Sequence, residues 1–350
     1  MNVSAHDISE LPRGAAPAAG QAIAVARGSN QSGMRAYNER LVLSLVRQSG
    51  PLAKAQISQM TGLSAQTVSV IMRALEAEGL LEKGEPVRGK VGQPSVPMAL
   101  NKSGAFFLGL KIGRRSVGLV LTDFMGQVVD RISQYGGYPS PDGVVQFTRD
   151  GIKTLLDKLP PEHQARVAGL GIALPFQLWD WAGLLEAAPV EMADWRARDI
   201  AADIADICDF PVFLCNDASA ACGAELVFGD QDRPRDFLYF FVSYFVGGGL
   251  VLDNALYIGA TGNAAALGSI PVASADGSMR QLVDIASLVR LEMALAERGG
   301  DRDQRGDELS SPRAAARVSR RCHGSALPVA HASSSDAAVR GGRSVASHAW

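Results

Sequence analysis

The sequence predicts an α/β protein in which a small, mainly helical N-terminal domain precedes a larger body. Two observations predict this fold class: apolar residues recur with helical spacing before residue 81, and short alternating apolar runs separated by helical segments follow residue 105. With 350 residues, 47% of them hydrophobic and 20% charged, the chain is long enough for two or three domains. We expect folded domains at residues 34–100 and 101–300.

The chain begins with a segment that we expect to be a disordered arm. Residues 1–33 are rich in Ala, Gly, Ser and Pro and show no apolar period, so they cannot bury enough surface to fold. A first helix is then expected from Tyr37 to Gln48. Its inward-facing side chains should be Leu41, Leu45 and Val46.

Two short helices joined by a tight turn are expected between residues 53 and 81. Glycine accepts a left-handed backbone at low cost, so Gly62 should end the earlier helix, and Ser64 has the hydroxyl that a helix N-cap needs. The expected apolar face of the earlier helix is Ala55, Ile57 and Met60. The expected buried stripe of the later helix is Val68, Ile71, Met72 and Leu75.

The later helix carries short or amide side chains near its N-terminus, opposite the apolar stripe. Such side chains can approach base edges and phosphates without steric conflict, which is typical of a recognition helix in the major groove of DNA. The candidate DNA-binding residues on this helix are Ser64, Ala65, Gln66, Thr67, Ser69 and Arg73.

A strand, a Gly/Pro-rich turn and a second strand are expected from Glu82 to Asn101. A basic, glycine-containing turn of this kind can follow phosphates or enter the minor groove, as the wing of a winged helix-turn-helix does. We therefore interpret residues 34–100 as a winged helix-turn-helix, with a helical hairpin inside a larger helical domain as the alternative. The expected DNA contacts at the wing tip are Arg88, Lys90 and Gln93.

The distribution of charge differs between the two expected domains. Residues 34–100 hold eight Lys and Arg against five Asp and Glu, a net charge of +3, whereas residues 101–300 hold sixteen against twenty-four, a net charge of −8. A basic head on an acidic body suits a DNA-binding module. The four cysteines form no CxxC pair and are expected to be reduced thiols, and we find no export signal and no apolar run of ~20 residues. We expect a cytoplasmic protein with no membrane partner.

The body begins with three alternating apolar runs, at residues 105–113, 116–124 and 126–135, which predict an antiparallel meander. A helix is expected at Val144 to Leu159, a buried strand at Val167 to Ala173, a helix at Ala193 to Cys208 and a strand at Val212 to Leu214. Asn216 and Asp217 follow that strand and open a further helix. Polar side chains at a strand's carboxyl end commonly line a ligand crevice.

The rest of the body should form a second meander and a closing helix. Strands are expected at Phe237 to Phe245 and Leu250 to Leu252, followed by a glycine-rich loop from Tyr257 to Asn263 and an amphipathic helix from Ser278 to Arg298. Residues 301–350 contain eight arginines and no Ile, Phe or Tyr. That composition predicts a disordered tail or an aberrant one, such as a shifted reading frame near residue 300 would produce.

The order of these pieces resembles the ROK family of sugar-responsive repressors and sugar kinases, over about residues 34–298. Four segments match the family in order: LGLKIGRRSVGLVLTD, CNDASAACGAE, FVGGGLVL and GATGNAAALGSIPV. The resemblance implies a two-lobed body of the actin-like ATPase (ribonuclease H-like) fold. It also implies the regulator branch of the family, which carries an N-terminal winged helix-turn-helix.

Several departures from the kinase pattern of the family argue against catalysis. Where kinase members place an Asp and a small Gly-Gly-Thr-Lys turn that cradles phosphate, this sequence has Lys111, Arg114 and Arg115. Their second phosphate turn reads Ser243-Tyr244-Phe245 here, and Ser269 replaces the histidine of their zinc cluster. We therefore expect no enzyme activity, no catalytic residue, no cofactor and no metal site.

The residues that contact the sugar in the family are retained to a greater extent than its phosphate-binding turns. Asn216 and Asp217 match the Asn-Asp pair whose aspartate takes a proton from the sugar hydroxyl in kinases, and Asn263 matches a residue near the sugar. Ala266 and Ser269 stand where two further sugar contacts are usual. The alternatives are that the Asn-Asp pair only caps a helix, that the glycine segments are turns without a ligand, and that Arg114 and Arg115 form a solvated hairpin tip.

Together these features predict a DNA-binding transcriptional regulator, most simply a repressor, controlled by a sugar or sugar-like effector. Its expected partners are a double-stranded DNA operator, the effector bound at Asn216, Asp217 and Asn263, and further copies of the chain in a homodimer or homotetramer. Two alternatives stay open: a sugar kinase with an accessory DNA-binding head, and a body that serves only as an oligomerisation scaffold.

Overall fold

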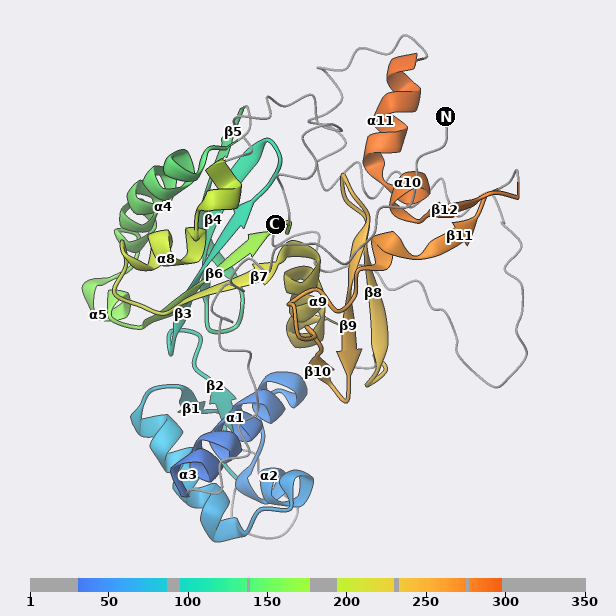
Figure 1. The fold of residues 1–350 in the computed structure, drawn as a ribbon. Helices are drawn as coiled ribbons and strands as arrows, with labels where there is room; N and C mark the ends of the chain where they lie inside the picture. The colour runs from blue at the N-terminus through green and yellow to red at the C-terminus, as the bar shows by residue number, and fades with distance from the viewer. Residues whose placement is uncertain are drawn as a thin grey trace.

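The computed structural model describes residues 31–86, 95–136, 139–176, 194–229, 233–274 and 277–297, which form a head and two lobes (Figure 1). The head is the N-terminal part, drawn in blue. Its elements are α1 (Gln31–Ser49), α2 (Lys54–Thr61), α3 (Ala65–Ala77), β1 (Leu81–Lys83) and β2 (Met98–Leu100). The expected arm at residues 1–33 lies outside the described residues except at its end, because α1 begins at Gln31.

The two short helices of the head form as predicted. Ser64 caps α3 by accepting a hydrogen bond from the backbone N–H of Thr67 at 3.1 Å, and Gly62 ends α2 with a left-handed φ of +71°. The four residues predicted for the buried stripe of α3 are all buried: Val68, Ile71, Met72 and Leu75.

The predicted inner faces of α1 and α2 are partly wrong. Ile57 is fully buried, but Met60 is 55% exposed and Ala55 is exposed as well, because α2 is one short helix that reaches the core with a single side chain. In α1 the fully packed positions are Val42 and Val46, whereas Leu41 is only partly buried. The buried Val42 directly follows the predicted Leu41, so the inner face of α1 is displaced to the neighbouring position.

The strands of the wing pair as predicted. β1 and β2 are antiparallel, with Leu81 opposite Leu100, and Leu52 forms a further bridge to Met98 that ties the wing to the helices. The wing-tip residues Arg88, Lys90 and Gln93 lie outside the described residues.

Lobe I is built on a five-stranded sheet of order β5-β4-β3-β6-β7, in which the predicted meander is confirmed. β3 pairs antiparallel with β4 and parallel with β6, and β6 pairs parallel with β7. Helices α4 and α8 lie on the same face of the sheet (Figure 1). The elements are β3 (Phe106–Ile112), β4 (Ser116–Asp123), β5 (Val128–Tyr135), α4 (Pro141–Leu156), α5 (Pro161–Gln164), β6 (Val167–Leu174), α8 (Ile200–Ala205) and β7 (Val212–Asn216).

The single helix expected from Ala193 to Cys208 is broken in two. Residues 194–197 are helical, and α8 then starts anew because the Asp199 side chain accepts a hydrogen bond from the backbone N–H of Ala202 at 3.1 Å. Arg198, between the two helical pieces, pairs with Asp142 and Asp203, each at 2.8 Å. The capping aspartate was visible in the sequence, but the alanine-rich period around it hid the break.

Lobe II contains a three-stranded sheet of order β10-β9-β8 and a small β11-β12 hairpin. Helix α9 follows β7 and lies between the sheets of the two lobes (Figure 1). The elements are α9 (Asp217–Phe228), β8 (Phe237–Phe241), β9 (Gly247–Leu252), β10 (Ala255–Leu256), the 3-10 helix η3 (Leu267–Ser269), β11 (Pro271–Ala273), β12 (Met279–Gln281), α10 (Val283–Ala286) and α11 (Leu288–Glu297).

The amphipathic helix expected from Ser278 to Arg298 is wrong over its first part. Residues 279–281 form β12, which pairs with β11, and two helices follow with a break at Ser287. The buried Ser287 hydroxyl accepts a hydrogen bond from the backbone N–H of Val246 at 2.9 Å, which holds the break against the β8–β9 turn. The tail expected at 301–350 lies outside the described residues. None of the helices in the described ranges is long and apolar enough to cross a membrane.

Candidate functional site

The candidate effector site lies where the parallel strands of lobe I end. Lys111 of β3 is in register with Ala173 of β6, and Asn216, the last residue of β7, is in register with Leu174. The carboxyl ends of parallel strands commonly border ligand crevices in α/β sheets. The sheet therefore brings Lys111 to the same edge as Asn216 and Asp217.

Asn216 is the N-cap of α9. Its side-chain oxygen accepts hydrogen bonds from the backbone N–H groups of Ala218 and Ser219, at 3.0 and 3.2 Å. The capping role that the sequence left open is thus present. It occupies the side-chain oxygen and fixes the amide group at the carboxyl end of β7.

Asp217 forms an ion pair that the sequence did not reveal. Its Oδ2 lies 2.5 Å from Nζ of Lys111, and the Asp217 side chain is only 13% exposed. The other oxygen, Oδ1, accepts a hydrogen bond from the backbone N–H of Ala218 at 2.9 Å. Lys111 Nζ also lies 6.0 Å from the ring centre of Phe241 on β8, so it is near both lobes. The Asp217 carboxylate at the start of α9 is therefore held in place by Lys111 and Ala218, and Lys111 balances its charge.

Asn263 is exposed on the glycine-rich loop that follows β10. The loop approaches the end of β6, because a Cβ built on the neighbouring Gly262 would lie 3.3 Å from the ring of Phe176. Within the described ranges no hydrogen bond joins Asn263 to Asn216 or Asp217. The structure thus brings together the loop and the strand ends without a direct contact between the three predicted residues.

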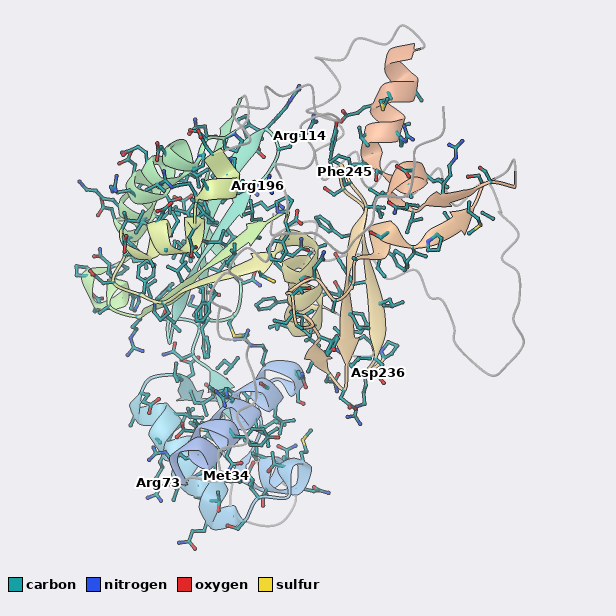
Figure 2. All side chains as sticks on the ribbon, in the orientation of Figure 1. Met34, Arg73, Arg114, Arg196, Asp236 and Phe245 are labelled. Atoms are coloured by element: carbon teal, nitrogen blue, oxygen red, sulfur yellow. The ribbon has the colours of Figure 1, made fainter. Side chains whose placement is uncertain are left out.

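The tip of the β3–β4 hairpin is packed against lobe II, so the expectation of a solvated tip is wrong for Arg114. Its guanidinium carbon lies 3.6 Å from the ring centre of Tyr244, and Nη2 lies 3.7 Å from Oε2 of Glu292. Tyr244 in turn meets Phe245 edge-on at 4.9 Å. Figure 2 labels Arg114 on lobe I and Phe245 on lobe II, where the two lobes face each other. Arg115 is exposed.

The glycines of the FVGGGLVL segment lie in strand β9 and allow close packing. A Cβ on Gly249 would overlap Cys222 of α9, and a Cβ on Gly248 would overlap Leu267 of η3. Strand β9 therefore sits directly on α9. These glycines have a packing role that needs no ligand.

The candidate DNA-binding residues of α3 lie on the outer surface of the head, and Arg73 points away from both lobes (Figure 2). Ser64, Ala65, Gln66 and Arg73 are exposed, and Thr67 and Ser69 are partly buried. The Ser64 and Thr67 hydroxyls lie 2.8 Å apart, and Nε of Arg73 donates to the Ser69 carbonyl at 3.1 Å. Val70 was not among the predicted contacts, although it is 48% exposed on the same surface. The sequence hint for it is that this apolar residue stands outside the buried stripe of α3.

Two family models match the chain. The model of the ROK family matches residues 107–283, and a model described as winged helix-turn-helix DNA-binding matches residues 35–82. The first spans both lobes and the second spans the three helices of the head and the start of the wing.

Individual relatives agree with these models. The chain is 26% identical over 246 residues to the xylose repressor of Bacillus subtilis, covering 70% of this chain and 62% of the relative. It is 26% identical over 227 residues to a transcriptional regulator of Mycobacterium tuberculosis, covering 63% of this chain and 50% of the relative. The chain thus spans less than two thirds of the length of the curated relatives that it matches. A crystal structure of a ROK family transcriptional regulator, a homologue of the Escherichia coli MLC protein, superposes with a TM-score of 0.55 at 22% identity. That superposition covers 77% of this chain and 69% of the other.

Proposed function

The chain belongs to the ROK family, and from that premise we propose that it is a transcriptional repressor whose body binds a sugar without phosphorylating it. The head supplies a winged helix-turn-helix with a capped, exposed α3. Relatives named as xylose repressors support the regulatory function, and they make D-xylose the first effector to test.

The observation that carries the proposal is the ion pair between Lys111 and Asp217. In the family resemblance, Asp217 stands where kinases keep the carboxylate that accepts the proton of the attacked hydroxyl. Both carboxylate oxygens already accept hydrogen bonds, Oδ2 from the Lys111 ammonium group at 2.5 Å and Oδ1 from the backbone N–H of Ala218 at 2.9 Å, so the carboxylate is not a free general base. It remains a good acceptor for a hydrogen bond from a sugar hydroxyl.

A second observation opposes the binding of nucleotide. The stack of Arg114 on Tyr244 occupies the space between the two hairpin turns that hold phosphates in kinase members of the family. Phosphate cradles need small residues that expose backbone N–H groups, and both turns carry bulky side chains here. To bind a phosphate, Arg114 would have to give up its stacking on Tyr244 and its ion pair with Glu292.

In the mechanism that we propose, sugar binding between the lobes changes their relative angle. In a homodimer or homotetramer this change alters the distance between two α3 helices, and thus their fit to half-sites about 34 Å apart. The DNA contacts we propose are Gln66, Val70 and Arg73 from α3, with Ser64, Ala65, Thr67 and Ser69 beside them. The wing should add Arg88, Lys90 and Gln93.

Sugar binding and catalysis are tested on the purified full chain. Thermal unfolding should shift upward with a binding sugar, because a ligand at 100 times its dissociation constant adds about 2.7 kcal/mol of stability. Asp217→Ala should lose the shift, whereas Asp253→Ala, at an aspartate whose side chain is 89% exposed, should keep it. A coupled assay should detect no ATP turnover with pentoses or hexoses.

Two results would overturn the proposal in different ways. ATP turnover would favour a sugar kinase with a DNA-binding head. If no sugar shifts the unfolding temperature, the body is better explained as an oligomerisation scaffold. The replacement of two usual sugar contacts of the family by Ala266 and Ser269 is consistent with that alternative.

A further inference from the structure

Helix α9 joins the candidate effector site to the head. It starts at Asp217, beside Lys111, and ends at Phe228, next to α1 of the head. Its 12 residues correspond to a rigid rod about 18 Å long. One end of α9 therefore contacts the candidate effector site and the other contacts the head, and in the proposed function sugar binding at the site must affect the head.

At the far end of α9 an arginine of the head lies between two aromatic rings. The guanidinium carbon of Arg47 is 5.5 Å from the ring centre of Phe228 and 5.1 Å from that of Phe124 in lobe I. Arg47 also donates a hydrogen bond to the Phe124 carbonyl at 2.5 Å. Since Arg47 lies in the last turn of α1, this contact bears directly on the orientation of a helix of the head.

The head is fixed to lobe I by several contacts. Phe124 and Ala105 of lobe I belong to the hydrophobic core of the head. Arg166, at the start of β6, donates hydrogen bonds to the carbonyls of Glu78 and Gly104, at 3.2 and 3.0 Å. The head is therefore attached to lobe I, and its contact with α9 at Arg47 is a separate one.

Helix α9, in contrast, is packed on lobe II. Gly249 of β9 lies so close to Cys222 of α9 that a Cβ on the glycine would overlap the cysteine. A change in the angle between the lobes must then displace α9 relative to lobe I and the head. We expect this displacement to change the contact between Phe228 and Arg47.

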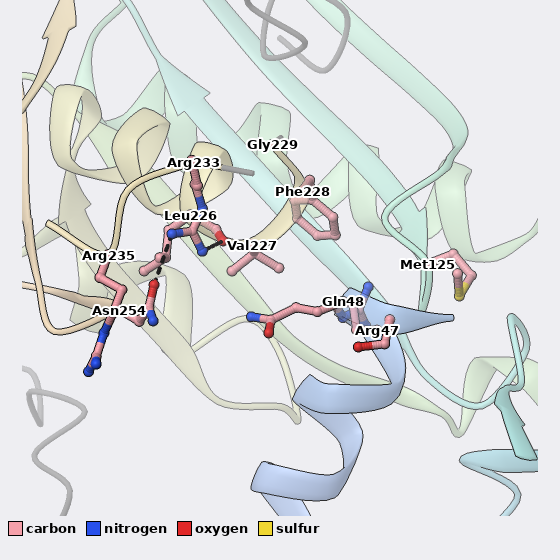
Figure 3. Close-up of a pocket in the computed structure, with 11 residues that line it drawn as sticks. Arg47, Gln48, Met125, Leu226, Val227, Phe228, Gly229, Arg233, Arg235 and Asn254 are labelled. Atoms are coloured by element: carbon pink, nitrogen blue, oxygen red, sulfur yellow. Dashed lines mark hydrogen bonds between the residues drawn. The ribbon is translucent and has the colours of Figure 1, made fainter. Parts of the chain in front are cut away.

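The surroundings of Phe228 combine a close contact on one side with open space on another. A Cβ on Gly126, in the β4–β5 turn, would overlap the Phe228 ring. Beside the ring, a cavity of about 440 Å³ lies between the head and the end of α9 (Figure 3). Arg47, Gln48 and Met125 line it together with Phe228. The ring is thus in close contact with Gly126 and also borders the cavity.

We propose that Phe228 and Arg47 are the contact through which occupancy of the site at Asp217 changes the orientation of the DNA-binding head. The inference rests on the proposed function and names the residues that link its two sites. Coupling needs an element whose contacts differ between the liganded and unliganded states, and we expect the end of α9 to be that element. By linkage, DNA must change the affinity for the sugar by the same factor as the sugar changes the affinity for DNA.

The test compares four full-length proteins: wild type, Phe228→Ala, Phe228→Tyr and Phe213→Ala. Phe213 on β7 is the matched control, because it is 54% exposed against 49% for Phe228 and lies on a strand of lobe I and not at the end of α9. For each protein, fluorescence anisotropy gives the dissociation constant of a DNA site selected by the protein from genomic fragments, with and without saturating D-xylose. Calorimetry gives the dissociation constant of D-xylose.

In wild type and in Phe213→Ala the sugar should change the DNA dissociation constant by a factor of about 5–150, the usual range of coupling between sites. Phe228→Ala should reduce that factor to about 2 or less while DNA and sugar separately bind as in wild type. Phe228→Tyr keeps the ring and should keep the coupling. A residue that only stabilised the fold would change the separate affinities or the melting temperature and leave the ratio intact.

Two results would overturn the inference. Unchanged coupling in Phe228→Ala would show that the signal does not pass through this contact, with the proposed function left standing. Wild type that binds DNA but responds to no sugar would refute the proposed function, and the inference with it. If Phe228→Ala fails to fold, Arg47→Lys, which keeps the charge and loses the planar stack, serves as the second variant and should lose the coupling in the same way.

Discussion

Lys111 and Asp217 are joined by an ion pair of 2.5 Å, although they are 106 residues apart in the chain. Lys111 lies on the third strand of the protein and Asp217 opens helix α9, so the pair ties the sheet of lobe I to the helix that carries lobe II. The pair also places a cation beside the carboxylate that matches the catalytic base of the family's kinases. The proposed absence of catalysis depends on it.

The ion pair should be measurable as a coupling energy in unfolding. Lys111→Met leaves a carboxylate that is 13% exposed without its partner, which should cost about 1–3 kcal/mol of unfolding free energy. The double variant Lys111→Met, Asp217→Asn should cost less than the two single changes added together, as urea unfolding of the four proteins would show. The exposed pair of Lys158 and Asp130, at 4.0 Å, is the control and should give less than about 0.5 kcal/mol. Strict additivity at Lys111 and Asp217 would contradict this interpretation.

The proposed recognition surface predicts a loss of sequence discrimination in Gln66→Ala. An amide that contacts a base edge contributes about 1–3 kcal/mol to the preference for the correct base, and little to binding through phosphates. Specific DNA should therefore bind more weakly by that amount while random DNA binds as before, in anisotropy titrations at one salt concentration. Gln134→Ala, at an exposed glutamine of lobe I, is the control. An equal loss on both DNAs would count against base contact by Gln66.

Close packing of β9 on α9 predicts that Gly249→Ala is destabilising. The added methyl group must push against Cys222, and overpacking of this kind costs about 1–3 kcal/mol. Gly171→Ala in β6 is the control, since a Cβ at that glycine meets no atom within 4 Å. Urea unfolding should separate the two variants clearly. Equal stability would mean that β9 is free to move off the helix.

The thiol of Cys222 predicts a specific loss of stability at alkaline pH. Burial, and to a lesser degree the charge of Glu225, raises the pKa of Cys222 to about 11 from an ordinary value of 9.0. The folded protein therefore keeps a proton that the unfolded chain releases above pH 9, so this stabilising contribution is complete below pH 9 and is lost as the pH rises towards 11. Cys222→Ala should unfold with a shallower pH dependence in that window. Identical slopes for the two proteins would refute the raised pKa.

The parts of the fold that depend on local pattern were predictable. The capped α3 with its four buried apolar residues, the meander of β3, β4 and β5 and the start of α9 after a strand all follow from periodicity and helix caps that lie within a few residues of one another. A short segment is harder, as Met60 shows: α2 has so few turns that its apolar period does not decide which side chains are buried.

The parts that depend on distant partners were not predictable. Residues 279–281 have a helical pattern but form a strand because β11 offers a pairing edge. Arg114 has the composition of a solvated turn but stacks on Tyr244 of the other lobe. The candidate site could be located at Asn216 and Asp217 from the end of a strand, yet its cation, Lys111, became visible only when the sheet aligned β3 with β6 and β7.

The central claim, that a sugar controls DNA binding by this protein, is tested most directly by one titration. Purified full-length protein is added to a labelled genomic site that it has itself selected, and to random DNA of equal length, with and without D-xylose and a panel of other pentoses and hexoses. We expect binding to the selected site to be at least about 1,000-fold tighter than to random DNA, and to change at least about 5-fold with one sugar. Equal binding to both DNAs, or a preference that no sugar alters, would contradict it.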